Sequence, residues 1–544
     1  MKHLTLFLFL AGSLICKTAF GQESNYSVLK NFNETGGQAT RFDLSMAAID
    51  AHDGEIALFD GIYYLYGTSY DCGYEWQTPG APFCGFKSYS SRDLVNWTDE
   101  GFLFDAQNEI WQTRCDGKTY GCYRPHVIYN KKNNLYVLWI NVYDNRVGFR
   151  VFTSPSPTGP FTEVAEPTLA VNSNSPVAGL NNGDHDLFVD EDNIAYLAYT
   201  DWRTGGTIVI DQLDENYTSG TGKHVKAVTS GRTEAPCLTR RNNIYYILYS
   251  DPNCGYCTTG TSYKTSSSPL GPWSEGIKIT DNSCGGQPSF VSIFKLEKET
   301  VYLYGSDLWN NGAKNEALAN YFWAPLTFDD NGAINPIICQ NATVPIDPYK
   351  GDDSKMVAIA TLEQKLDFVT QGVEYTLKGG KLNLEQLDCS SGVDGFTSYS
   401  DIRDNIHRGQ SFVATRTGIL STISFVSSKS GHPDAGLTIE VYKANDAFQP
   451  VGKALSSNIV SVDSMGWAPR LMAVQPNIQV EAGTRYTIIM KTESTKGSYG
   501  FQYSDSAPYA GGGAIYSSNK GVNFTIEANR TLMFQTFVQP KLKY

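Results

Sequence analysis

Several features that define other protein classes are scarce in this 544-residue sequence. Only 18 % of the residues are charged, and acidic residues outnumber basic ones, so the formal net charge is −13. An acidic surface repels phosphate groups, which argues against nucleic acid as a partner. No segment shows sustained helical periodicity, and beyond the N-terminus no apolar run is long enough to span a membrane. Aromatic residues are instead abundant, at 13 %, as in an ordered β-rich protein.

The N-terminus resembles an export signal at residues 1–21. Lys2 and His3 precede a mostly apolar run at 4–15, and Ala19-Phe20-Gly21 is a small-residue cleavage site, so the mature chain would begin at Gln22. The alternative is lipidation at Cys16, although Ser13-Leu14-Ile15 is a poor lipobox. We therefore expect a secreted or periplasmic protein.

Cysteine usage agrees with export. Of the eleven cysteines, ten remain once Cys16 is removed, and an even number in an exported chain indicates disulfides. The sequence does not give the full connectivity. Plausible local pairs are Cys72 with Cys84, Cys115 with Cys122, and Cys254 with Cys257, the last being a better disulfide than a zinc site.

An internal repeat is the most informative feature. Each of five segments has a polar or acidic start, an apolar strand, a polar turn and an aromatic-rich strand. The matching tyrosines are 50 to 72 residues apart, the length of a four-stranded blade with variable loops, and they are Tyr64, Tyr136, Tyr196, Tyr246 and Tyr302. The sequence therefore predicts an all-β protein built on a five-bladed β-propeller.

The repeat stops near residue 345. We assign residues 22–345 to the propeller, 346–392 to a connecting segment, and 393–544 to a jelly-roll-like β-sandwich with Gly-, Asn- and Ser-rich turns. The β-sandwich either binds sugar, through residues such as Trp467, Tyr503 and Tyr509, or stabilises the chain.

The blade starts carry the candidate chemistry. The first strand of each propeller blade lines the central channel, so Asp53, Asp184, Glu234 and Gln287 are expected to converge, together with Arg124. Carboxylates that face one another raise each other's pKa, which is costly unless the arrangement is used. Hydrolysis of a glycosidic bond needs carboxyl groups whose pKa values differ. One group must be protonated, and a second group must orient water.

In this order, Asp53, Asp184 and Glu234 resemble the catalytic triad of glycoside hydrolase family 43. The resemblance covers about residues 45–335. It implies that Asp53 is the general base, that Asp184 tunes and orients the acid, and that Glu234 is the general acid of an inverting reaction. Glu55 and Asp186 are weaker rivals for Asp53 and Asp184. The resemblance implies no required cofactor, and it allows a structural calcium ion in the channel.

Within that family, several segments are similar to the exo-β-1,3-galactanase branch: 51–52, 124–130, 233–236, 286–290 and 305–309. The branch lacks the usual base and uses a Gln in the fifth blade, which Gln287 matches. This sequence departs from the branch at Asp53, where Gly is usual, and at Tyr123, where Glu is usual. The similarity makes galactan or arabinogalactan the expected substrate. The departure at Tyr123 keeps galactofuranosidase or arabinofuranosidase activity as the alternative.

Further residues are candidates for substrate binding. His52, His126 and His185 fall at channel-facing blade starts and would hydrogen bond to sugar hydroxyls or to the carboxylates. Trp309 is the loop aromatic we assign to sugar contact; other loop aromatics are Tyr70, Trp76, Trp111 and Tyr256. No metal ligands are assigned. Two non-enzymatic hypotheses remain, a propeller lectin and an adhesion protein, and we expect a monomer.

Overall fold

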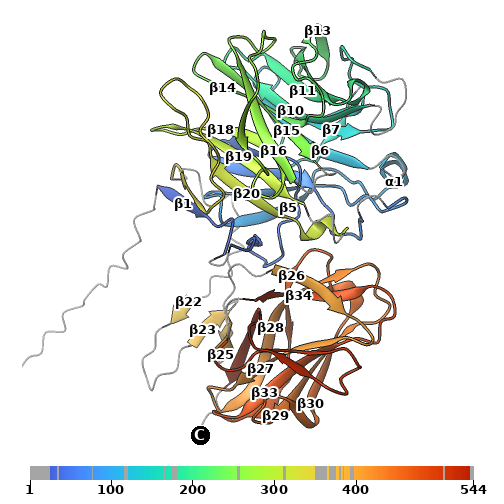
Figure 1. Cartoon of the computed structure of the whole chain (residues 1–544), viewed down its shortest axis with the longest axis vertical. Coiled ribbons are helices and arrows are strands. Elements are labelled where there is room, and N and C mark those ends of the chain that lie inside the picture. Colours follow the sequence, from blue (N-terminus) through green and yellow to red (C-terminus); the bar gives the residue numbers. More distant parts are fainter. Residues whose placement is uncertain are drawn as a thin grey trace, which may run out of the picture.

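Nearly all regular structure in the computed structural model is β-strand (Figure 1). The structure describes residues 25–33, 36–75, 78–115, 121–164, 166–172, 181–253, 258–309, 314–348, 364–366, 375–378, 381–383, 385–391, 397–505 and 509–539. The predicted export signal, Cys254, Cys257, Trp76 and Tyr256 lie outside these residues.

Five antiparallel sheets follow one another along the chain and form the predicted five-bladed propeller, the upper unit in Figure 1. Four blades have four strands and the fifth has three. The first blade contains β2 (Ile56–Phe59), β3 (Ile62–Thr68), β4 (Phe86–Ser91) and β5 (Trp97–Phe102). The second contains β6 (Cys122–Asn130), β7 (Leu135–Val142), β8 (Phe149–Ser154) and β9 (Thr162–Glu163). The third contains β10 (Asn182–Val189), β11 (Ala195–Asp201), β12 (Thr207–Leu213) and β13 (Gly220–Val225). The fourth contains β14 (Glu234–Arg241), β15 (Ile244–Asn253), β16 (Thr258–Ser266) and β17 (Ile277–Thr280), and the fifth β18 (Gln287–Lys295), β19 (Thr300–Leu308) and β20 (Asn320–Pro325).

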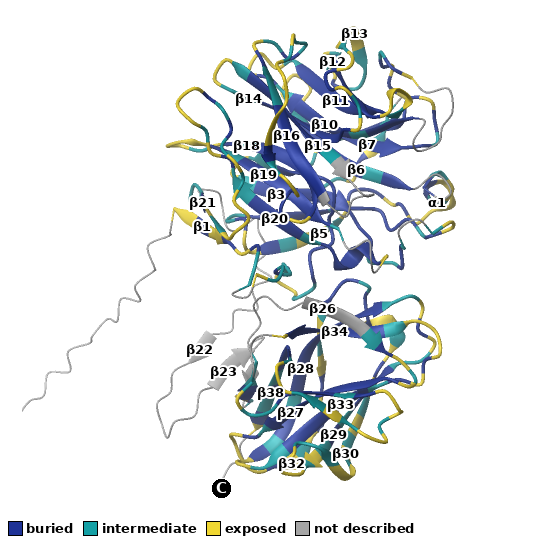
Figure 2. Ribbon diagram, viewed as in Figure 1, coloured by how far each residue is buried: buried dark blue, intermediate teal, exposed yellow. Residues whose placement is uncertain are grey.

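The aromatic residues of the repeat fill the spaces between blades. The inner strands are buried along most of their length (Figure 2). Between the first and fifth blades, Tyr63 packs edge-on against Phe294 with ring centroids 5.0 Å apart, and Trp97 packs against Trp323 at 5.8 Å. Each large apolar side chain buried in this way stabilises the fold by roughly 2–3 kcal/mol.

The two ends of the propeller sequence meet. Strand β1 (Tyr26–Leu29) pairs antiparallel with β21 (Ala342–Pro345). The Asn31 side chain then joins this pair to the fifth blade, because it accepts a hydrogen bond from the Trp323 N–H and donates one to the Trp323 carbonyl, both at 2.9 Å. The ring is thus closed by contacts between residues about 300 positions apart.

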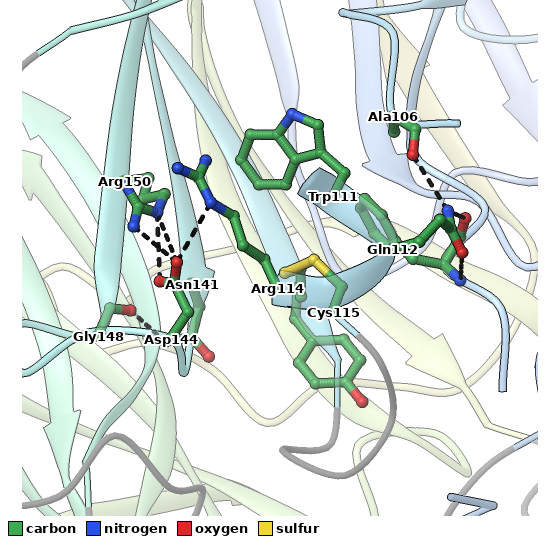
Figure 3. The surroundings of a disulfide bond; sticks show 12 residues. Ala106, Trp111, Gln112, Arg114, Cys115, Asn141, Asp144, Gly148 and Arg150 are labelled. Atoms are coloured by element: carbon green, nitrogen blue, oxygen red, sulfur yellow. Dashed lines mark hydrogen bonds and ion pairs between the residues drawn. A yellow bond between two sulfur atoms is a disulfide. The ribbon is translucent and has the colours of Figure 1, made fainter. Parts of the chain in front are cut away.

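Helical segments are short and lie in loops: α1 (Glu109–Arg114), η1 (Trp202–Thr204) and η2 (Glu316–Leu318). Asn108 caps α1 by accepting a hydrogen bond from the Trp111 N–H. The helix is attached at its end by the Cys115–Cys122 disulfide and by Arg114, whose guanidinium lies 3.3 Å from Asp144 (Figure 3).

The predicted disulfides Cys72–Cys84 and Cys115–Cys122 are both present, and Cys284–Cys339 is a third. Among the described residues, Cys237 and Cys389 are buried free thiols. The same part of the chain contains no helix long and apolar enough to cross a membrane.

The C-terminal part is a β-sandwich, with its apolar core between two sheets. One sheet has six strands, in the order β30-β29-β33-β27-β35-β36, and the other runs β25-β38-β28-β34-β26, with β31 and β32 pairing with β28 and β37 with β34. Before them, β22 (Gln364–Leu366), β23 (Tyr375–Lys378) and β24 (Lys381–Asn383) form a small sheet. The sandwich elements are β25 (Gln386–Ser390), β26 (Thr397–Ile402), β27 (His407–Val413), β28 (Gly418–Ser430), β29 (Leu437–Ala444), β30 (Pro450–Val460), η4 (Val462–Ser464), β31 (Arg470–Val474), β32 (Ile478–Val480), β33 (Arg485–Lys491), β34 (Ser498–Ser504), β35 (Ala514–Ser517), β36 (Thr525–Glu527), β37 (Thr531–Leu532) and β38 (Phe534–Gln539).

Candidate active site

Irregular backbone at the blade starts directs side chains into the channel. The pairing of the first two strands is interrupted near the start of blades two to five, at Tyr123/His126, Asn182/His185, Glu234/Cys237 and Pro288/Phe290. Positive φ angles accompany these irregularities at Arg124 (56°) and Ala235 (49°), and Asp53 in the first blade has a φ of 55°. Bulges re-aim side chains, and non-glycine residues with positive φ are concentrated at functional sites.

The general-acid candidate Glu234 lies in a buried hydrogen-bonded group. The side-chain amide of Gln287 donates from Nε2 to Glu234 Oε1 at 2.5 Å and is 3.3 Å from Asp184 Oδ2. The other end of the amide, Oε1, accepts a hydrogen bond from Trp309 Nε1 at 3.0 Å. Asp184, Glu234, Gln287 and Trp309, which come from different parts of the repeat, are therefore brought together.

Arg124 connects this group to Asp53. Its guanidinium forms a two-point ion pair with Asp184, with Nε 3.1 Å from Oδ1 and Nη2 3.2 Å from Oδ2. Its backbone N–H donates to Asp53 Oδ1 at 3.1 Å. Burial disfavours the guanidinium charge, but Asp184 and Asp53 outweigh this effect and raise the pKa of Arg124. Arg124 is thus the one fixed positive charge we find among the catalytic candidates.

Asp53 is buried, with 4 % of its surface exposed. Its Oδ1 accepts a hydrogen bond from Thr68 Oγ1 at 2.7 Å, and its Oδ2 accepts one from the Tyr70 hydroxyl at 3.2 Å. Burial raises the pKa of Asp53 to about 7; Arg124 lowers it, and Asp307 raises it. This carboxyl group can therefore change its protonation state near neutral pH.

Glu55, His126 and Asp186 form a second, buried layer of ionisable groups. His126 Nδ1 lies 3.0 Å from Asp186 Oδ1, and Asp186 Oδ2 accepts a hydrogen bond from the Leu238 N–H at 2.6 Å. Glu55 accepts a hydrogen bond from the Val127 N–H, and burial raises its pKa to about 7. The two rivals weighed from the sequence, Glu55 and Asp186, thus bond to backbone in this layer rather than to Glu234 or Gln287.

The three predicted substrate-binding histidines are fully buried. His52 lies 3.5 Å from Asp50 and 3.6 Å from Asp307, and His126 faces Asp186. His185 packs against the His126 and Phe149 rings, and burial lowers its pKa well below the usual value. Of the two roles expected from the sequence, the geometry supports bonding to carboxylates for His52 and His126, because a sugar cannot reach fully buried rings.

Some site residues were not predicted as such. Tyr70 was noted only as a loop aromatic, yet its hydroxyl bonds to Asp53. Tyr143 is buried beside Asp184 and Glu234, and burial together with these charges raises its pKa. Tyr123, which replaces the Glu of the galactanase branch, shares a 2.8 Å hydrogen bond with the Tyr74 hydroxyl. Trp111, another of the loop aromatics, is instead buried in α1.

The residues give no support for a metal site. In the part of the chain that the structure describes, no three His, Cys, Asp or Glu side chains are arranged to hold a metal ion. His52 and His126 face carboxylates, whereas His185 packs against the His126 and Phe149 rings.

A propeller with paired carboxyl groups at its blade starts is the architecture of a glycoside hydrolase. The family model of glycosyl hydrolases family 43 matches residues 44–320. The chain belongs to this family, and it is a glycosidase.

Two curated relatives match somewhat less than half of this chain. A β-D-galactofuranosidase of Aspergillus niger is 28 % identical over 262 residues, which cover 46 % of this chain and 72 % of the relative. An arabinoxylan arabinofuranohydrolase of Bacillus subtilis is 28 % identical over 255 residues, which cover 41 % of this chain and 49 % of the relative.

Among solved structures, an exo-β-1,3-galactanase of Clostridium thermocellum is similar with 21 % identity and a TM-score of 0.49. The match covers 73 % of this chain and 94 % of that one. An exo-β-1,3-galactanase of Phanerochaete chrysosporium is 18 % identical, with 88 % of this chain and all of that chain covered and a TM-score of 0.46.

Proposed function

We propose that the protein is an exported, exo-acting and inverting glycosidase that releases galactose from galactan or arabinogalactan side chains. The observation that carries the mechanism is the Gln287 amide between Glu234 and Asp184. This amide holds Glu234, the proposed proton donor, next to Asp184. Asp53, which accepts a hydrogen bond from the Arg124 backbone, supplies the second carboxyl group.

Glu234 is the general acid in this proposal. The Gln287 N–H donates to Glu234 Oε1 and holds the carboxyl group in place, and Glu234 gives its proton to the leaving-group oxygen. The Arg124 guanidinium holds Asp184, and Asp184 contacts the Gln287 amide that bonds to Glu234. Asp184 therefore fixes the position of Glu234 through this amide.

Asp53 is the general base. Three donors, from Thr68, Tyr70 and the Arg124 backbone, fix its orientation and leave capacity on the carboxylate for one water. The ionised form removes a proton from this water as the water attacks the anomeric carbon. The proton gained by Asp53 balances the one lost by Glu234, and attack from the opposite face inverts the anomeric centre.

The choice of sugar is supported by sequence similarity. The segments shared with the exo-β-1,3-galactanase branch favour galactose, and the A. niger relative is named for a galactofuranose substrate. The B. subtilis relative is named for arabinoxylan, which keeps arabinofuranosidase activity as the second candidate. Export is supported by the signal-like residues 1–21 and by the three disulfides.

The test is sugar release by the chain from residue 22 onward, using β-1,3-galactan, arabinogalactan, arabinan, xylan and galactofuranosides. We expect galactose from one of the first two, and no release by Glu234→Gln. Release of arabinose or of galactofuranose would replace the proposed sugar. Binding of a polymer without any release would overturn the enzymatic mechanism in favour of a lectin.

A further inference from the structure

The β-sandwich pairs with the propeller next to the active site. The Ala48 N–H donates to the Pro469 carbonyl at 2.7 Å, and the Leu471 N–H donates to the Met46 carbonyl at 2.9 Å. These bonds form a short antiparallel contact just before Asp50. The sandwich is therefore attached to the segment of chain that leads to Asp53.

The same part of the sandwich binds the turn that carries Tyr70. The Asp71 carboxylate accepts a hydrogen bond from the Ala468 N–H at 2.8 Å and pairs with the Arg470 guanidinium. On the propeller side, Asp50 accepts hydrogen bonds from the backbone N–H groups of Tyr70, at 2.9 Å, and Asp71, at 3.0 Å. The turn is thus held from both units.

Trp467 of the sandwich packs against the next residues of this loop. A Cβ atom placed on Gly73 would lie 2.9 Å from Trp467 Cζ2, so the indole touches the backbone there, where φ is +93°. The indole is itself fixed, because Nε1 donates to the Gly431 carbonyl at 2.9 Å and Lys429 Nζ lies 4.0 Å from the ring centre. The Cys72–Cys84 disulfide fixes the other side of the loop.

A second active-site loop is bound by the same face. The buried Asn315 donates from Nδ2 to the Trp467 carbonyl at 3.2 Å and to the Lys429 carbonyl at 3.4 Å. Asn315 follows Trp309, whose indole holds the Gln287 amide. Ala317 and Ala468 belong to one buried cluster that also contains Tyr70 and Tyr74.

We propose that the β-sandwich is a positioning element of the active site, in which Arg470 and Trp467 hold the 70–74 loop so that the Tyr70 hydroxyl orients Asp53. This inference rests on the proposed function of Asp53 as base. Arg470 and Trp467 touch no reacting group and act through Tyr70. The C-terminal unit is therefore part of the catalytic structure and not only an attached module.

Charge explains why Arg470 is the sensitive residue. The side chains of Asp50 and Asp71 are both largely buried and bond to the same turn. Burial and the nearby Asp50 raise the pKa of Asp71 to about 6, and Arg470 opposes this rise. Without Arg470, two close carboxylates repel each other in a poorly solvated place, and the turn relaxes by moving Asp71 outward.

The experiment compares Arg470→Ala, Arg470→Lys, Tyr70→Phe and the double variant Tyr70→Phe/Arg470→Ala in the chain from residue 22 onward. The control is Arg485→Ala, which removes a half-buried sandwich arginine paired with Asp446, remote from the 70–74 loop in sequence. We expect Arg470→Ala to lower kcat about tenfold with little change in KM, and Arg470→Lys to recover most of it. The double variant should be no slower than Tyr70→Phe, because both changes act on one contact.

A normal kcat in Arg470→Ala would overturn the inference. So would a double variant whose loss of kcat equals the product of the losses in Tyr70→Phe and Arg470→Ala. If Arg470→Ala does not fold, Arg470→Met replaces it, since it removes the positive charge that pairs with Asp71 and keeps a long apolar side chain. Hydrogen exchange of residues 69–75 provides a readout without substrate. If the wild type cleaves no glycoside, the proposed function fails, but faster exchange in Arg470→Ala and not in Arg485→Ala still supports positioning, and unchanged exchange overturns it.

Discussion

Gln287 donates its amide N–H to Glu234 at 2.5 Å, and the direction of that bond is set from the opposite end of the amide. Trp309 Nε1 can only donate, so the Gln287 atom it contacts at 3.0 Å must be the oxygen. The nitrogen is then forced to face Glu234. The Trp309 indole therefore fixes which atom of the Gln287 amide faces the acid Glu234.

Replacing Glu234 by Gln should remove proton donation while leaving the shape of the site intact. We expect kcat on natural glycosides to fall by about 10²–10⁴-fold. Activity on a dinitrophenyl glycoside, whose leaving group needs no proton, should fall much less. Steady-state kinetics on both substrates measure this difference, with Glu191→Gln, at an exposed carboxylate, as the control. Equal losses on both substrates would contradict the role of acid.

Trp309→Phe should lower kcat/KM by about fivefold, which corresponds to one lost hydrogen bond of about 1 kcal/mol. The Gln287 amide would no longer be held in one orientation, so its oxygen could face Glu234. The matched control is Trp273→Phe, a partly buried indole packed between the third and fourth blades. An unchanged kcat/KM in Trp309→Phe would show that the amide is oriented without the indole.

The pH profile of kcat/KM should have its acid limb near pH 7. Asp53 must be ionised to accept a proton, and burial raises its pKa to about 7, so activity should rise as the pH increases through that value. Thr68→Val removes a hydrogen bond that favours the ionised form, and it should move the limb to higher pH. An acid limb near pH 4 in the wild type would exclude Asp53 as the group that sets it.

The first sugar product should have the inverted anomeric configuration. Asp53 and Glu234 lie in different blades, and the proposed mechanism places a water between Asp53 and the sugar. Proton NMR recorded within the first minutes, before mutarotation, distinguishes the two anomers. A product with retained configuration would require a covalent intermediate and would change Asp53 from base to nucleophile.

His52 should make stability depend on pH. Burial disfavours its charge, but Asp307 and Asp50 outweigh burial and raise its pKa to about 9. Its contribution to the free energy of unfolding is therefore fully present below pH 6.5 and is lost as the pH rises through 9. The size of this contribution is roughly 3 kcal/mol.

Urea unfolding measures this effect. Between pH 6 and pH 10, the free energy of unfolding should fall more in the wild type than in His52→Gln. The exposed His224→Gln variant should behave as the wild type, and an equal pH dependence in His52→Gln would disprove the charged pair.

The internal repeat was sufficient to predict the five blades and the residues that converge at the blade starts. Because equivalent positions in a propeller share one axis, the blade starts were enough to bring Asp184, Glu234 and Gln287 into one group before any coordinates were known. The same periodicity predicted five blades. Proximity along the chain likewise predicted the disulfides Cys72–Cys84 and Cys115–Cys122.

The sequence could not predict how deeply a side chain is buried, or which residues far apart in the chain contact one another. His52, His126 and His185 share the channel-facing pattern, but only packing shows that they lie below the reach of a sugar. Arg470 is about 400 residues from Asp71, and no local pattern relates the two. Tyr70 carries no signal either, since an aromatic residue in a loop stacks on sugar as readily as it orients a carboxylate.

The pairing of β1 with β21 has a consequence for how the protein is made. In each unit a strand near its start pairs with one near its end, since β25 also pairs with β38. A chain that emerges from its N-terminus therefore carries unpaired first strands until residues 342–345 and 534–539 follow. Closure over such long separations is slow. During synthesis each unit therefore passes through an interval in which its closing strand pair has not yet formed.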